Sequence, residues 1–192
     1  MSLVELNNEY TDKNTLHSYL PLYNELLSNK KDTAKNILEV GIADGGSIKL
    51  WNDYFINATV YGLDIGTPER IMTDILNKDN ILLFHSTDAY NEDVFREIIL
   101  SKNIKFDMVL DDGPHTLESM IQFIKLYSQV LTDDGILIIE DVQNWDWIDN
   151  IQEVVPDHLK QYIKIYDLRA NKNRYDDILF IIDKSAISIE NV

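Results

Sequence analysis

The chain has 192 residues, of which 45% are hydrophobic, and its 33 acidic and 17 basic side chains give a formal net charge of −16. This length and composition suit one folded domain with a substantial core, and a surface this negative repels phosphate backbones, so we expect no nucleic-acid partner. Because the sequence contains no cysteine, disulfides, zinc thiolate sites and a cysteine nucleophile are excluded.

The N-terminus, MSLVELNNEYTDKN, has neither a basic leader region nor an apolar run of the ~20 residues that a membrane span needs. We therefore expect a cytoplasmic protein without membrane contacts, and leave homo-oligomerisation open. Residues 1–35 are expected to form a helical lid or cap. Four polar residues can contribute to such a lid: Asp12, Lys13, His17 and Tyr19. The alternative is a helix packed on the sheet through an apolar stripe, formed by Tyr19, Leu20, Tyr23, Leu26 and Leu27.

Strand and helix patterns alternate along the rest of the chain. The apolar run 36–40 ends at Gly41, and a helical pattern of apolar residues follows it at spacings of three and four. Further strands are predicted at 59–65, 81–85, 106–111 and 135–141. Helices are predicted at 91–102 and after Thr116, which we expect to be an N-cap. Two last strands, 162–168 and 177–183, suggest a terminal antiparallel hairpin.

This order predicts a single α/β domain over 1–192, with a doubly wound, mostly parallel, seven-stranded sheet of the Rossmann-like kind. Ligands of such sheets bind outside the carboxyl ends of the strands. The residues that follow each strand therefore indicate where a site would lie and what it would bind.

The first strand ends in LEVGIADGGS, a glycine turn that allows a ligand to approach the backbone. The spacing from Gly41 to Gly46 is that of G-x-G-x-x-G, but Ala43 takes the middle place. An ordinary strand-to-helix turn is the alternative. The candidate cofactor-binding residues here are Glu39, Gly41, Ala43 and Ser47.

The second and third strands also end in candidate cofactor-binding residues. Asp64, followed by Ile65, lies where an acidic side chain can accept hydrogen bonds from ribose hydroxyls. Thr87 and Asp88 follow the third strand, where an adenine amino group would be recognised. A local capping role is the alternative for Asp88.

The fourth strand ends in Asp111-Asp112 with His115 just beyond, and the fifth ends in Glu140-Asp141. Carboxylates thus follow all five strands at one edge of the sheet. Because so dense a set of like charges is unfavourable unless cations or hydroxyl donors occupy it, this joint pattern favours a functional site over scattered solvated acids.

Both NAD and S-adenosylmethionine use a glycine turn and an acidic residue after the second strand. Three features favour S-adenosylmethionine. Glu39 precedes the turn where dinucleotide-binding strands stay apolar, no Tyr-x-x-x-Lys pair occurs, and the length leaves no separate substrate domain. An NAD-linked oxidoreductase and a non-catalytic cofactor-binding module of the same fold remain the alternatives.

With these motifs, the chain resembles the class I S-adenosylmethionine-dependent methyltransferases over nearly its whole length. It is most similar to the metal-dependent macrolide-sugar O-methyltransferases and the related cephalosporin hydroxylase-like group. The resemblance is carried by DDGPH, where those proteins have D-D-G-S-H, by IIED, and by YTDKNTLHSYLPLY. Pro114 departs from the usual serine. The larger sugar enzymes have additional N-terminal regions, so the chain resembles their catalytic domain alone.

The resemblance implies that Asp112, Glu140 and Asp141 bind a divalent metal, and carboxylate oxygens are hard ligands suited to Mg²⁺, with Mn²⁺ or Ca²⁺ as alternatives. A small hydroxylated substrate, a sugar or glycosylated metabolite, would complete the metal's shell, and His115 would take its proton as general base. Asp111 is expected to face the cofactor. The alternatives are that His115 caps the following helix and that Asp141 only solvates a loop.

Overall fold

The computed structural model describes residues 1–185. The helices longer than one turn are α1 (Tyr19–Leu27), α2 (Gly46–Tyr54), α3 (Glu92–Ile98), α4 (Leu117–Tyr127) and α5 (Trp147–Glu153), and a short helix α6 (Arg169–Lys172) follows them. The strands are β1 (Asn36–Val40), β2 (Thr59–Leu63), β3 (Ile81–Phe84), β4 (Phe106–Asp111), β5 (Leu131–Ile139), β6 (Ile163–Asp167) and β7 (Ile178–Asp183).

The strands form one seven-stranded sheet in the order β3-β2-β1-β4-β5-β7-β6. The pairs from β3 to β5 are parallel, and β7 runs antiparallel to both β5 and β6. The predicted fold class, a doubly wound and mostly parallel sheet with a terminal antiparallel hairpin, is confirmed. The order reverses between β1 and β4, and this switch point is where such folds bind ligands.

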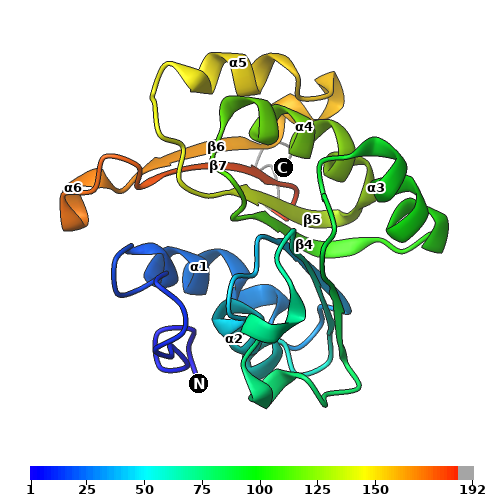
Figure 1. Cartoon of the computed structure of the whole chain (residues 1–192). Coiled ribbons are helices and arrows are strands. Elements are labelled where there is room, and N and C mark those ends of the chain that lie inside the picture. Colours follow the sequence, from blue (N-terminus) through cyan, green and yellow to red (C-terminus); the bar gives the residue numbers. More distant parts are fainter. Residues whose placement is uncertain (186–192) are drawn as a thin grey trace, which may run out of the picture.

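Helices cover both faces of the sheet, with α1 and α2 on one side and α3, α4 and α5 on the other (Figure 1). Two buried apolar clusters correspond to these two layers. One includes Tyr23 and Trp51 from the α1/α2 side, and the other includes Phe95, Phe123 and Tyr127 from the α3/α4 side. Because both faces are buried, strands such as ILII in β5 are apolar at every position.

Two predicted boundaries differ from the structure in ways that affect the site. β5 begins at Leu131 and ends at Ile139, so Glu140 and Asp141 lie beyond the strand. Asp141 has a positive φ of 54°, which an extended strand does not adopt. The helix after β4 begins as predicted, because the Thr116 side chain accepts a hydrogen bond from the Ser119 backbone N–H and caps it.

The first eighteen residues contain turns and no helix, so the helical segment predicted over residues 1–35 begins only at α1. Residues 9–12, 15 and 16 line the carboxyl edge of the sheet. We call residues 8–18 the N-terminal strap. The strap contacts the start of α2, where Asn8 Nδ2 donates to the Gly46 carbonyl at 2.9 Å. At its other end, Lys172 Nζ donates to the carbonyls of Asn14 and Thr15 at 2.6 and 2.9 Å. Among residues 1–185, no helix is both long enough and apolar enough to cross a membrane.

Candidate active site

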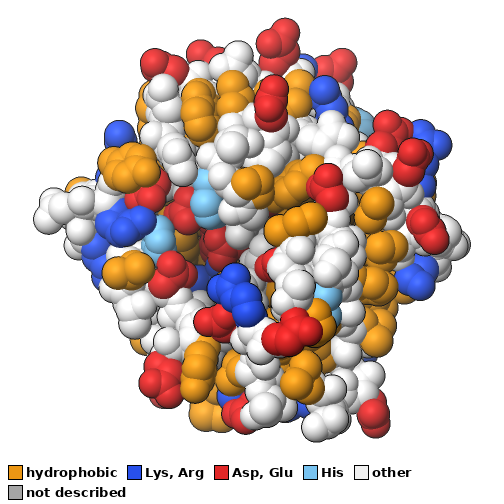
Figure 2. Space-filling view, viewed as in Figure 1, with side chains coloured by type: hydrophobic (Ala, Val, Ile, Leu, Met, Phe, Trp, Pro, Cys, Tyr) orange, Lys and Arg blue, Asp and Glu red, His pale blue; other side chains and the backbone are white. Residues whose placement is uncertain are grey.

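A cavity of about 990 Å³ opens at the carboxyl ends of the strands, beneath the strap. In Figure 2 this face is hollowed among acidic, basic and histidine side chains. Its walls come from the turns after β1, β2, β3 and β4, from the residues after β5, and from the strap. The cavity therefore lies where parallel α/β sheets bind ligands.

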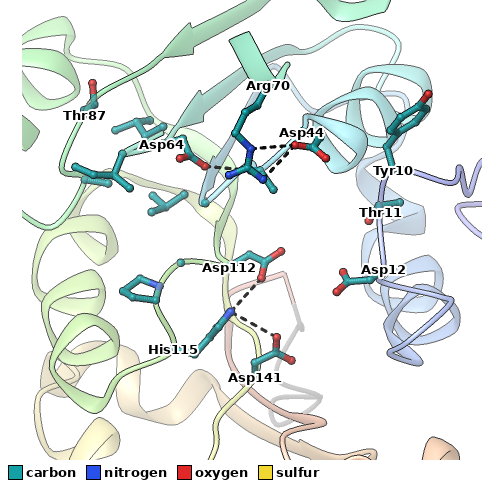
Figure 3. A pocket seen from close by; sticks show the side chains of 18 of the residues that line it. Tyr10, Thr11, Asp12, Asp44, Asp64, Arg70, Thr87, Asp112, His115 and Asp141 are labelled. Atoms are coloured by element: carbon teal, nitrogen blue, oxygen red, sulfur yellow. Dashed lines mark hydrogen bonds and ion pairs between the residues drawn. The ribbon is translucent and has the colours of Figure 1, made fainter. Parts of the chain in front are cut away.

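Nine of the predicted site residues line the cavity: Gly41, Ala43, Asp64, Ile65, Thr87, Asp88, Asp112, His115 and Asp141. The other four are buried behind its wall: Glu39, Ser47, Asp111 and Glu140. The topology thus brings all the predicted residues to one edge, as Figure 3 shows for five of those that it labels. Their roles in binding stay predictions.

The glycine turn after β1 packs tightly against the turn after β4. Gly41 has a φ of +80°, and a Cβ added to it would lie 2.0 Å from the Asp112 carbonyl oxygen. Asp64 holds the same turn from the other side, because its Oδ2 accepts hydrogen bonds from the Ile42 and Ala43 backbone N–H groups at 2.8 and 3.0 Å. The turn is therefore a fixed wall of the cavity.

Behind the cavity, Asp111 is buried at 3% exposure and accepts a hydrogen bond from the Tyr90 hydroxyl. Burial raises the pKa of Asp111 to about 7. Asp88 lines the cavity beside them, and its Oδ1 also accepts a hydrogen bond from the Tyr90 backbone N–H at 3.0 Å. Asp88 thus makes a local turn contact, whereas the N-cap of α3 is Asn91.

Asp112, His115 and Asp141 form a cluster on the cavity wall (Figure 3). His115 Nε2 lies 3.6 Å from Asp112 Oδ1 and 3.7 Å from Asp141 Oδ2. His115 and Asp141 both have positive φ, at 52° and 54°. Such backbone conformations cost energy in non-glycine residues and concentrate at functional sites. Thr116, not His115, caps α4.

The second oxygens of these two carboxylates face the N-terminal part of the chain. Asp112 Oδ2 accepts a hydrogen bond from Lys13 Nζ at 2.7 Å. Asp141 Oδ1 accepts one from the Tyr19 hydroxyl, and His17 Nδ1 lies 3.3 Å away. One oxygen of each carboxylate is therefore held from behind, while the other faces His115.

Glu140 is held at both oxygens. Oε1 accepts a hydrogen bond from the Tyr23 hydroxyl and Oε2 one from Lys13 Nζ, both at 2.5 Å. Lys13 Nζ also lies 3.4 Å from Glu39 Oε1, and its side chain is 1% exposed. Burial alone would lower the pKa of Lys13, but the surrounding carboxylates raise it well above its ordinary value. Lys13 is therefore an ammonium ion at neutral pH.

Of the two roles predicted for this segment, helix packing on the sheet is present in α1, and the lid over a cofactor stays a prediction. Asp12 lines the cavity, whereas Tyr19 and Tyr23 are buried in α1. The contacts of Lys13 with Asp112 and Glu140 span 99 and 127 residues. Apart from the YTDKNTLHSYLPLY resemblance, no local signal in the sequence pointed to them.

The donor set at Asp112 and Asp141 fits a hard divalent cation. Two carboxylate oxygens, Asp112 Oδ1 and Asp141 Oδ2, face the same imidazole and border the open cavity, which leaves space for water or substrate ligands. Magnesium prefers such sites, with one or two carboxylates and several further oxygen ligands. Glu140 accepts one hydrogen bond at each oxygen, from Lys13 and from Tyr23, and each oxygen keeps a further lone pair that a metal could use. Its role as a metal ligand stays a prediction.

No protein-family model matches the chain. Among curated proteins, it is 26% identical over 144 residues to the 8-demethyl-8-alpha-L-rhamnosyl tetracenomycin-C 2'-O-methyltransferase of Streptomyces olivaceus. This match covers 71% of the chain and 36% of that protein. It is 28% identical over 155 residues to the mycinamicin VI 2''-O-methyltransferase of Micromonospora griseorubida, covering 76% and 37%. The chain thus spans little more than a third of these relatives.

Solved structures show the same fold. The MycE methyltransferase in complex with Mg, SAH and mycinamycin VI matches with a TM-score of 0.73 and 19% identity, over 95% of this chain and 53% of that one. The Aeropyrum pernix fibrillarin with natively bound S-adenosyl-L-methionine matches with a TM-score of 0.59 and 16% identity, over 79% of this chain and 66% of that one. The resemblance drawn from the sequence motifs is therefore confirmed at the level of the fold.

Proposed function

We propose that this chain, which has the Rossmann-like fold of the class I methyltransferases, is an S-adenosylmethionine-dependent and divalent-metal-dependent O-methyltransferase. Its substrate would be a hydroxyl group of a small molecule, a sugar or a glycosylated metabolite. The observation that carries the proposal is the cluster of Asp112, His115 and Asp141 on the wall of the cavity at the switch point of the sheet.

The charge of the cavity supports S-adenosylmethionine over NAD. Seven acidic residues line it: Glu9, Asp12, Asp44, Asp64, Asp88, Asp112 and Asp141. Among the described residues, one lysine or arginine lines the cavity, and that residue is Arg70. Arg70 Nη2 lies 3.2 Å from Asp44 Oδ1. This field attracts a sulfonium and an ammonium group and repels the pyrophosphate of NAD.

Residues from three turns would hold the cofactor. Gly41 and Ala43 allow it close to the backbone after β1, Asp64 and Ile65 would contact its ribose and adenine, and Thr87 and Asp88 close the adenine end. Ile65 is 73% exposed, which is unusual for a large apolar residue that lines a cavity. Bound adenine would cover it.

In catalysis, S-adenosylmethionine supplies a methyl group on a cationic sulfur, and a divalent metal would lower the pKa of the acceptor hydroxyl and orient it. Asp112 and Asp141 would hold the metal through the oxygens that face the cavity. His115 Nε2 lies 3.6 and 3.7 Å from those oxygens and would take the hydroxyl proton as the O–CH₃ bond forms and the S–CH₃ bond breaks.

The relatives support a glycosylated acceptor, because one is named as the 2'-O-methyltransferase of a rhamnosyl tetracenomycin-C and another as the 2''-O-methyltransferase of mycinamicin VI. Since the chain spans 36–37% of those proteins, the acceptor itself is part of the proposal. A nucleic-acid substrate, as for the rRNA-processing fibrillarins of the same fold, is disfavoured by the net charge of −16. A cytoplasmic location and homo-oligomerisation stay predictions from the sequence.

Calorimetric titration tests the cofactor assignment. We expect S-adenosylmethionine to bind with micromolar affinity and NAD to show no binding, with magnesium or with a chelator present. Methyl transfer to a panel of deoxysugar glycosides should require the metal. Tight binding of NAD without binding of S-adenosylmethionine would refute the proposal.

The base is tested with His115→Ala, and Leu16→Ala serves as a control for truncation of a side chain elsewhere on the cavity wall. His115→Ala should keep the affinities for cofactor and metal within about threefold of the wild type, and its kcat should fall about 10²- to 10⁴-fold. If the variant loses the metal while the metal-saturated activity persists, His115 is a ligand and not the base.

A further inference from the structure

Lys13 is a buried lysine placed inside the predicted metal-binding cluster. Its Nζ lies 2.7 Å from Asp112 Oδ2, 2.5 Å from Glu140 Oε2 and 3.4 Å from Glu39 Oε1, and the side chain is 1% exposed. The proposed catalysis uses Asp112 but gives the lysine no role. A buried ammonium that contacts three carboxylates nevertheless has a large effect on any other cation bound there.

The charges around Lys13 are strongly unbalanced. The cluster contains four carboxylates, those of Glu39, Asp112, Glu140 and Asp141. Three of them, Glu39, Glu140 and Asp141, are buried, and the side chain of Asp112 is 24% exposed. Within residues 1–185, Lys13 is the one lysine or arginine that forms ion pairs with this group, and it pairs with Glu39, Asp112 and Glu140. The partners of Asp141 are His17 and His115. Burying carboxylates without a counter-charge is costly, so the lysine stabilises this cluster when no metal is bound.

The lysine and a metal would use different atoms of the same groups. Lys13 takes Asp112 Oδ2, whereas Asp112 Oδ1 faces His115 and the cavity. The backbone around the lysine is also fixed, since the Tyr19 N–H donates to the Lys13 carbonyl at 2.9 Å and Lys172 holds the next two carbonyls. Lys13 therefore stays beside a metal, and the two cations repel each other across Asp112.

We propose that Lys13 is a built-in counter-cation that keeps the carboxylate cluster ordered without metal and weakens the binding of the divalent ion. Its ammonium sets the metal affinity, so that the cluster folds metal-free and binds the metal reversibly. This inference rests on the proposed function, because it assumes that the divalent ion binds at Asp112 and Asp141.

Lys13→Gln tests the role of the charge, because the amide keeps a hydrogen-bond donor and loses the positive charge. Isothermal titration with Mn²⁺, without S-adenosylmethionine, should show binding at least about tenfold tighter than in the wild type, because a like charge within a few ångströms has been removed. The metal-free variant should melt at a lower temperature, and Mn²⁺ should raise its melting temperature more than it raises that of the wild type.

Lys30→Gln is the matched control. Lys30 is also buried, at 3% exposure, and pairs with Asp134 at 2.7 Å, near the opposite end of β5 from Asp141. This change removes the same charge from the chain without touching the cluster, so the Mn²⁺ affinity should stay within about twofold of the wild type.

Unchanged or weaker Mn²⁺ binding by Lys13→Gln, in a wild type that does bind Mn²⁺, would overturn the inference and leave the proposed function standing. Failure of the wild type to bind Mn²⁺, with Asp112→Asn indistinguishable from it, would instead refute the proposed metal site. If Lys13→Gln unfolds without metal, recovery of its circular dichroism with Mn²⁺ supports the role, and failure to recover contradicts it.

Discussion

Asp112 and Asp141 each present one carboxylate oxygen to His115 and have the other held by Lys13 or Tyr19. The side of this arrangement that faces the cavity was predictable, because Asp112 and His115 share one short string and Asp141 follows the next strand. The rear half was not, because Lys13 reaches Glu140 across 127 residues. Only folding brings those groups together, and neither periodicity nor spacing encodes the contact.

Gly46 is a residue whose size determines how the strap lies. A Cβ added there would be 2.2 Å from the backbone of Tyr10. Alanine in a helix is ordinarily more stable than glycine by up to about 1 kcal/mol. In Gly46→Ala the clash with the Tyr10 backbone should exceed this gain in helix stability. We therefore expect the free energy of unfolding in urea to fall by about 1–3 kcal/mol and proteolysis within residues 1–18 to become faster.

A control for the strap contact is Asn8→Ala, which adds no atoms. It removes the 2.9 Å hydrogen bond to the Gly46 carbonyl and the 3.0 Å hydrogen bond that the Tyr10 backbone N–H donates to Asn8 Oδ1. It should cost about 1 kcal/mol and loosen the strap less than Gly46→Ala does. A Gly46→Ala protein that is more stable than the wild type, with an unchanged proteolysis pattern, would show that the strap can move aside freely.

The secondary-structure elements followed the sequence closely where hydrophobic periodicity governs them. The predicted bounds of β1 and β4 agree with the structure, and Thr116 caps α4. The position of β7 between β5 and β6 could not be predicted from the sequence, because either strand of a hairpin can pair with the edge of a sheet. The end of β5 was also missed, because the apolar run gives no sign that Asp141 turns into the left-handed region.

The pairing of β6 with β7 includes an ion pair whose effect on stability depends on pH. Lys164 Nζ donates to Asp183 Oδ2 at 2.8 Å, and the Ser185 hydroxyl donates to Oδ1 at 2.6 Å. Burial would raise the pKa of Asp183, but the hydrogen bonds from Lys164 and Ser185 outweigh it and the pKa is lowered. The carboxylate therefore stabilises the fold above its unfolded-state pKa, and this contribution is lost as the pH falls through the lower folded-state value.

Asp183→Asn should therefore destabilise the protein by about 1–2 kcal/mol at pH 7. The difference from the wild type should begin to shrink below about pH 4, where the carboxyl of the unfolded chain takes up a proton. Urea unfolding at pH 3.5 to 7 measures both. Asp157→Asn is the control, because Asp157 is 95% exposed in its pair with Lys160, and such surface pairs contribute little. A gap between wild type and Asp183→Asn that widens toward acid would contradict the assignment.

At the scale of the whole molecule, the net charge of −16 and the acidic cavity act in the same direction. The class I fold is shared with fibrillarin, so the fold alone leaves the substrate undecided. The distribution of charge separates the cases, because this surface favours cationic ligands and disfavours polyphosphates. That conclusion was accessible from composition, whereas the concentration of seven acidic residues around one cavity required the structure.

This field predicts how cofactor affinity depends on salt. S-adenosylmethionine carries one net positive charge, and its demethylated product S-adenosylhomocysteine carries none. Because salt screens the attraction between the cavity carboxylates and the sulfonium, raising NaCl from about 50 to 500 mM should weaken binding of S-adenosylmethionine by roughly threefold or more. Binding of the product should change by less than about twofold.

Titration calorimetry of both ligands at constant magnesium measures these two salt dependences. Asp44→Asn removes one charge from the cavity and should therefore reduce the difference between them. Equal salt dependence for the two ligands would mean that the acidic residues of the cavity do not act on the sulfonium.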